Sequence, residues 1–127
     1  MIRAVSPKWF IVLPVCACLD ACTTTPKVTY QNEVRRILAD KCNDCHKPPY
    51  GIGYLSTGLD TTSYKTLMTG SIYGPVVIPG NSRKSPLNML VEGRAGDLTR
   101  TLQTRHKSMT DDEIRQLRLW VEQGAKD

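Results

Sequence analysis

The sequence predicts an all-α domain, and three observations lead to this fold class. Apolar residues recur at helical spacing both before residue 42 and near the C-terminus. Thr110 followed by Glu113 forms a capping box, a common start of a helix. The compact apolar run Val76-Val77-Ile78 is stopped at once by Pro79-Gly80, so we expect a loop there rather than a strand.

The first 22 residues are typical of a lipoprotein-type export signal. Arg3 and Lys8 give a positive end, and the apolar run over residues 9–19 is too short to span a bilayer. The run ends in Leu19-Asp20-Ala21-Cys22, which is similar to the lipobox of bacterial lipoproteins, where a leucine and a small residue precede the lipidated cysteine. We therefore expect an exported protein that is lipid-anchored on the periplasmic face of a bacterial membrane.

Two cysteines are candidates for lipidation. If Cys22 is lipidated, cleavage before it removes Cys16 and Cys18 with the leader. No free thiol then remains outside the motif described below, which suits an oxidising compartment. Asp20 is unusual at its lipobox position, so Cys18 remains the alternative. An ordinary signal peptide or an uncleaved anchor is the third interpretation.

Residues 23–29 predict a short tether, because they begin as a polar tract, contain Pro26 and show no apolar period. Residues 30–127 then form one small domain. Removing the leader lowers the formal net charge from +5 to about +4, and the remaining basic residues are scattered. This charge pattern does not favour nucleic-acid binding.

The segment before residue 42 predicts a helix with an apolar stripe formed by Tyr30, Val34, Ile37 and Leu38. We expect this stripe to pack against the C-terminal helix, because that is the other long amphipathic segment of the chain.

The segment Cys42-Asn43-Asp44-Cys45-His46 has the spacing C-x-x-C-H, the signature of covalent haem attachment. Cysteines three residues apart lie on one helical turn, so Cys42 and Cys45 can each add to a vinyl group of the same porphyrin. His46 is then placed to bind the iron. A buried porphyrin would also enlarge a core that is poor in large aromatic residues.

Three other interpretations of this motif remain open: a redox dithiol, a structural zinc site and a buried cysteine pair. A thioredoxin-like dithiol requires a βαβ setting, and no strand-like runs flank the motif. A zinc site requires four ligands, yet outside the leader only His106 would join the Cys and His residues of the motif.

Short elements are expected between the motif and the last helix. The proline- and glycine-rich segment 47–53 predicts a loop. Thr61 or Thr62 would cap a short helix that Gly70 closes. Ser85-Pro86 would begin another short helix.

The last helix is expected from Thr110 to Gly124, with Asp111 and Asp112 at its positive end. Its apolar face comprises Ile114, Leu117, Trp120 and Val121.

The segment just before this helix holds two candidates for the sixth position of the iron, Met109 and His106. A thioether from Met109 would favour reduced iron and raise the potential, whereas a second imidazole from His106 would lower it. The two residues are three positions apart, so spacing does not choose between them.

Taken together, these pieces resemble class I cytochromes c, in particular the small bacterial domains of that family. The resemblance covers nearly all of residues 30–127. Its motifs are a helix leading into Cys42-Asn43-Asp44-Cys45-His46, Val77-Ile78-Pro79-Gly80 with Ser85-Pro86-Leu87, Met109, and Trp120-Val121-Glu122-Gln123-Gly124-Ala125. The chain departs from the family at Thr110, where a proline usually follows the distal methionine.

The resemblance implies a cytochrome c fold, with three main helices and short turns around one covalently bound haem. Cys42 and Cys45 would hold the haem, and His46 and Met109 would bind its iron. The protein would be a one-electron carrier rather than an enzyme, with redox donor and acceptor proteins as partners. It would act as a monomer or as a subunit of a respiratory complex.

Two alternative functions stay open. With an open or loosely held sixth position, the iron would bind small ligands or reduce peroxide, which would make the protein a sensor or a peroxidase-like enzyme. The haem could instead relay electrons as a subunit of a larger oxidoreductase complex.

Overall fold

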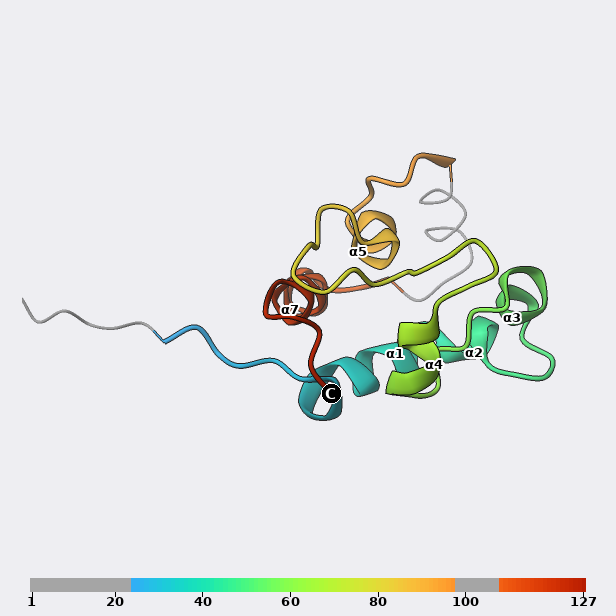
Figure 1. Cartoon of the computed structure of the whole chain (residues 1–127), viewed down its shortest axis with the longest axis horizontal. Helices are drawn as coiled ribbons and strands as arrows, with labels where there is room; N and C mark the ends of the chain where they lie inside the picture. Colours follow the sequence, from blue (N-terminus) through green and yellow to red (C-terminus); the bar gives the residue numbers. More distant parts are fainter. Residues whose placement is uncertain (1–23, 98–107) are drawn as a thin grey trace, which may run out of the picture.

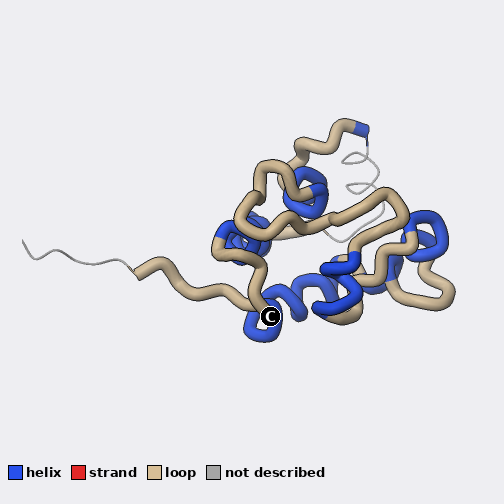
Figure 2. Tube along the Cα trace, viewed as in Figure 1, coloured by secondary structure: helices blue, strands red, loops and turns tan. Residues whose placement is uncertain are grey.

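The computed structural model of the chain describes residues 24–97 and 108–127. Its elements are η1 (Tyr30–Val34), α1 (Arg35–Lys41), α2 (Asn43–His46), α3 (Ile52–Thr57), α4 (Tyr64–Thr69), α5 (Pro86–Val91) and α7 (Asp111–Glu122). The described residues form helices and loops and contain no β-strand (Figure 2). Ser71 and Gly74 form one isolated β-bridge among them. The predicted all-α class is confirmed for these residues. Every helix in this described part of the chain is too short or too polar to span a bilayer.

The helix predicted before and through the motif is divided into three shorter pieces. Thr29 caps the π-helical turn η1 in a reciprocal capping box with Asn32, and α1 follows directly. At Cys42 the backbone leaves the helical region, with φ −120° and ψ −33°. Its carbonyl then accepts the N–H groups of Cys45 and His46, so the motif begins a new turn, α2.

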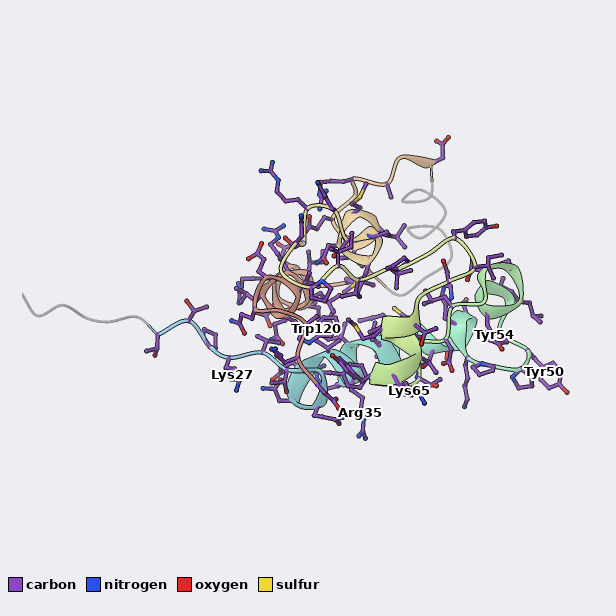
Figure 3. All side chains as sticks on the ribbon, in the orientation of Figure 1. Lys27, Arg35, Tyr50, Tyr54, Lys65 and Trp120 are labelled. Carbon is purple, nitrogen blue, oxygen red and sulfur yellow. The ribbon has the colours of Figure 1, made fainter. Side chains whose placement is uncertain are left out.

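The core lies between the first helical segment and α7, as the two apolar stripes predict. Trp120 is fully buried, and its Nε1 donates to the carbonyl of Lys126 at 2.7 Å. Its ring centroid lies 6.4 Å from that of Tyr30. Figure 3 shows Trp120 between α7 and the η1–α1 segment. The buried apolar residues are Val28, Tyr30, Val34, Ile37, Leu38, Leu67, Val77, Leu87, Leu117, Trp120, Val121 and Ala125.

The beginning of the described chain is fastened to its end. Gln123 accepts the N–H of Val28 at 2.9 Å and donates to the carbonyl of Pro26 at 2.9 Å. The N–H of Tyr30 donates to the carbonyl of Lys126 at 2.9 Å. Val28 is buried, so the packed part of the chain begins within the segment that the sequence assigns to a tether.

A second set of contacts joins the loop after α4 and the end of α5 to α7. The N–H of Gly80 donates to the carbonyl of Val121 at 2.7 Å, in the loop expected at this position. Glu92 forms ion pairs with Arg94 at 2.7 Å and Arg118 at 2.8 Å. Burial raises the pKa of Glu92, but the hydrogen bonds and charges of Arg118 and Arg94 outweigh burial and hold this pKa below its ordinary value.

Two local expectations are wrong. Ser63, and neither Thr61 nor Thr62, caps α4, because its hydroxyl accepts the N–H of Thr66 at 3.1 Å. The segment 47–53 is a loop only in its first part, since α3 begins at Ile52.

Candidate haem-binding site

The motif forms one compact turn. Cys42 lies at the N-terminus of α2, and its carbonyl accepts from the N–H groups of Cys45 at 3.2 Å and His46 at 2.9 Å. Both cysteines are free thiols, and both are half-buried, as is His46. The turn therefore presents two thiols and one imidazole from five consecutive residues, as the sequence predicts.

Cys42 is the thiol that packs on the hydrophobic core. Burial, assisted by neighbouring Cys45, raises its pKa to about 12. Redox-active dithiols have the opposite property, a lowered pKa that gives a reactive thiolate at neutral pH. The environment of Cys42 is therefore that of a protonated, structural thiol.

Thr61 holds the end of the motif turn, a role that the sequence does not reveal. It is buried, and its N–H donates to the carbonyl of His46 at 3.0 Å. Its hydroxyl donates to Oδ1 of Asn43 at 2.8 Å. Thr61 thus bonds to Asn43 at the start of α2 and to His46 at its end. The backbone of His46 is therefore held by a residue that lies outside α2.

Lys41 brings the segment around Met109 next to the motif. Its Nζ donates to the carbonyl of Ser108 at 3.2 Å and lies 3.6 Å from the carboxylate of Glu113. Met109 is half-buried and packs on the same core as Cys42. The residue before Cys42 therefore contacts both sides of the short segment that carries Met109.

Glu113 has two roles at this point. Its carboxylate accepts the N–H of Thr110 at 2.9 Å in the predicted capping box, and it also faces Lys41. Burial raises the pKa of Glu113, but the hydrogen bonds from Thr110 and the charge of Lys41 outweigh burial, so this pKa lies below its ordinary value of 4.5.

We expect replacement of Glu113 by glutamine to flatten the acid dependence of stability. A carboxylate with a lowered pKa stabilises the fold above its ordinary pKa, and this contribution is lost as the pH falls through the lowered value. Glutamine keeps the capping box and removes only the charge. Urea unfolding between pH 7 and pH 3 measures the effect, and Asp111→Asn, which changes an exposed charge in the same turn, is the control. Equal slopes in the wild type and Glu113→Gln would contradict the ionic role.

Other predicted residues lie outside the described residues. These are His106, the alternative to Met109, and Cys22 and Cys18, the alternative lipidation sites. Within residues 24–97 and 108–127, no three side chains among His, Cys, Asp and Glu come together as a metal cluster.

The residues around the motif fit a haem in their chemistry. The donor set combines two thiols, an imidazole and a thioether, which are the groups that c-type haem attachment and ligation use. Other partly exposed apolar side chains pack against the same core as Cys42 and Met109, namely Leu59, Tyr64, Met68, Val76, Val91 and Leu119. Such side chains offer the apolar contact that a porphyrin face requires.

Comparisons of this chain with protein families, with curated proteins and with solved structures find no match.

Proposed function

We propose that this protein is a one-electron carrier of the class I cytochrome c type. Cys42 and Cys45 would attach one haem, His46 would be its proximal ligand and Met109 its distal ligand. The fold would then be the cytochrome c fold over residues 30–127. Lipidation at Cys22 would hold the domain on the periplasmic face of a bacterial membrane, close to redox donor and acceptor proteins.

The observation that carries this proposal is the compact turn from Cys42 to His46, with the segment of Met109 fastened beside it by Lys41. The spacing C-x-x-C-H alone favours haem attachment. The pKa of the half-buried Cys42 thiol, raised to about 12, argues against a redox dithiol, which needs a lowered pKa. The hydrogen bond from Lys41 to Ser108 supports Met109 as the distal ligand, because it joins the residue before Cys42 to the residue before Met109.

A haem held at these residues would supply an iron that alternates between the ferrous and ferric states. The chain would contribute two strong ligands, so the coordination of the metal would not change with its charge. Thr61 would limit movement of His46, and the capped start of α7 would limit movement of Met109. Small rearrangement on electron transfer suits a carrier more than an enzyme.

The test is the absorption spectrum of the full chain after export in a host with haem-ligating machinery, recorded oxidised and reduced. A covalently bound, low-spin haem with the sulfur-to-iron band in the far red is expected. High-spin haem would refute the carrier proposal and favour ligand binding or peroxide reduction, and no covalent haem would refute haem attachment. In the same cells, Cys22→Ser should release the protein from the membrane fraction, whereas loss of anchoring in Cys18→Ser alone would move the lipid to Cys18.

Met109→Ala is expected to abolish the sulfur-to-iron band and to lower the midpoint potential by more than about 59 mV, the one-electron equivalent of a tenfold change. The reason is that thioether ligation favours reduced iron. Met68→Ala is the matched control, because Met68 is another half-buried methionine on the same core. The wild type could instead show a low-spin spectrum without the sulfur-to-iron band. If His106→Ala then loses the low-spin spectrum, the sixth position of the iron belongs to His106.

A further inference from the structure

Gly53, in the first turn of α3, lies against the imidazole of His46. A Cβ atom added to Gly53 would be 2.6 Å from Cε1, 2.7 Å from Nε2 and 2.9 Å from Nδ1 of that ring. Nearly equal distances to three consecutive ring atoms place this position over the face of the imidazole and not beyond its edge. Only the hydrogen atoms of a glycine fit between the backbone of α3 and the ring.

Gly51 allows this close approach. A Cβ atom at Gly51 would lie 2.4 Å from the carbonyl oxygen of Cys45 and 2.7 Å from that of Lys47. Its N–H donates to the carbonyl of Lys47 at 2.9 Å, so the chain folds tightly back from the motif. Figure 1 shows the result, with α3 beside α2.

The position of Gly53 is fixed from the other end of α3 as well. The hydroxyl of Thr57 donates to the carbonyl of Gly53 at 2.6 Å, and the carbonyl of Thr57 accepts the N–H of Ile72 at 2.8 Å. The N–H of Leu55 donates to the carbonyl of Gly51 at 2.8 Å. Because α3 is held at both ends, the imidazole and not the helix must give way to an added side chain.

We infer that Gly53 is a positioning residue for His46: its backbone limits rotation of the imidazole about the Cβ–Cγ bond and thereby sets the direction of Nε2. This inference rests on the proposed function, in which Nε2 binds the haem iron. Ordinary contact begins at 3.4 Å, so a methyl group at Gly53 would displace the ring by about 0.8 Å from its present place. A metal–ligand bond is sensitive to a shift of this size.

The test compares Gly53→Ala with the wild type in the full chain, exported with haem attachment. The covalent haem should be retained, because both cysteines are unchanged. The ferric low-spin electron paramagnetic resonance g values should shift, since they depend on the orientation of the axial imidazole plane. The acid midpoint for loss of the low-spin spectrum should rise by about one pH unit, which corresponds to about tenfold weaker imidazole binding.

Gly58→Ala is the control for a purely structural effect. Gly58 ends α3 with φ +67°, and an added Cβ would be 3.0 Å from Cγ2 of Ile72. Alanine there should lower thermal stability because of the positive φ, without changing the g values or the acid midpoint. Equal shifts in both variants, or a Gly53→Ala spectrum identical to that of the wild type, would overturn the positioning role.

A measurement without haem separates the two proposals. Nuclear Overhauser effects between the α-protons of Gly53 and Hε1 of His46 are expected in the folded chain whether or not haem is attached. Their presence in a protein that never acquires haem would support the contact and refute the electron carrier. Their absence from the folded wild type would overturn the positioning role.

Discussion

Replacing Cys42 and Cys45 together by alanine is expected to abolish covalent haem retention, while each single replacement leaves at most one thioether. The physical reason is that each thiol supplies one bond to the porphyrin, and both lie on the same turn beside His46. Haem staining after denaturing electrophoresis and the intact mass of the chain measure retention. The double variant should lose the stain completely.

The matched control for the cysteines is Asp44→Asn. Asp44 lies between the two cysteines on α2 but is exposed to solvent. This variant should retain haem at the level of the wild type. Full covalent retention in either single cysteine variant would contradict the assignment of both attachment sites.

Trp120→Ala is expected to have the largest effect on stability, a loss of about 3–5 kcal/mol in the free energy of unfolding. The side chain is fully buried, its ring contacts Tyr30, and its Nε1 donates to Lys126. A loss of this size is a large part of the total stability of a small domain. Urea unfolding followed by far-ultraviolet circular dichroism measures it.

Trp120→Phe separates packing from hydrogen bonding. Phenylalanine keeps a six-membered aromatic ring but has no N–H to donate to Lys126. Trp120→Phe should therefore lower the free energy of unfolding by about 1 kcal/mol for the lost hydrogen bond. Its additional packing loss should be smaller than that of Trp120→Ala. If Trp120→Ala costs no more than Trp120→Phe, packing between α7 and the first helical segment contributes little to the fold.

The sequence predicts those features of the fold that depend on neighbouring residues or on a periodic apolar pattern. The capping box of Thr110 and Glu113 is confirmed, because both partners lie within one turn. The packing of the first apolar stripe against the C-terminal helix is also confirmed, as the contact between Tyr30 and Trp120 shows. Two apolar stripes in a small helical domain have few other surfaces to pack against.

The features that the sequence does not predict depend on contacts across the chain. Thr61 is a plausible helix cap by residue type, yet its hydrogen bonds go back to Asn43 and His46, and Ser63 takes the capping position. In the sequence Gly53 looks like a helix breaker. Its close approach to the ring of His46 is visible only in the folded structure. The C-x-x-C-H spacing therefore predicts three of the donor groups of the candidate site, whereas the residues that hold this turn in place are visible only in the folded structure.

The fastening of Pro26 and Tyr30 to Gln123 and Lys126 has a mechanical consequence. A pull applied to the chain before Pro26 would reach the end of α7 first, because these hydrogen bonds join the two ends of the fold. In Figure 1 the N-terminal segment enters on the left, whereas the motif turn α2 lies on the right of the molecule, next to α3. In a domain tethered through its N-terminus, part of a pull would therefore pass to α7 before it reached the turn of His46, and that turn would move less than the tether.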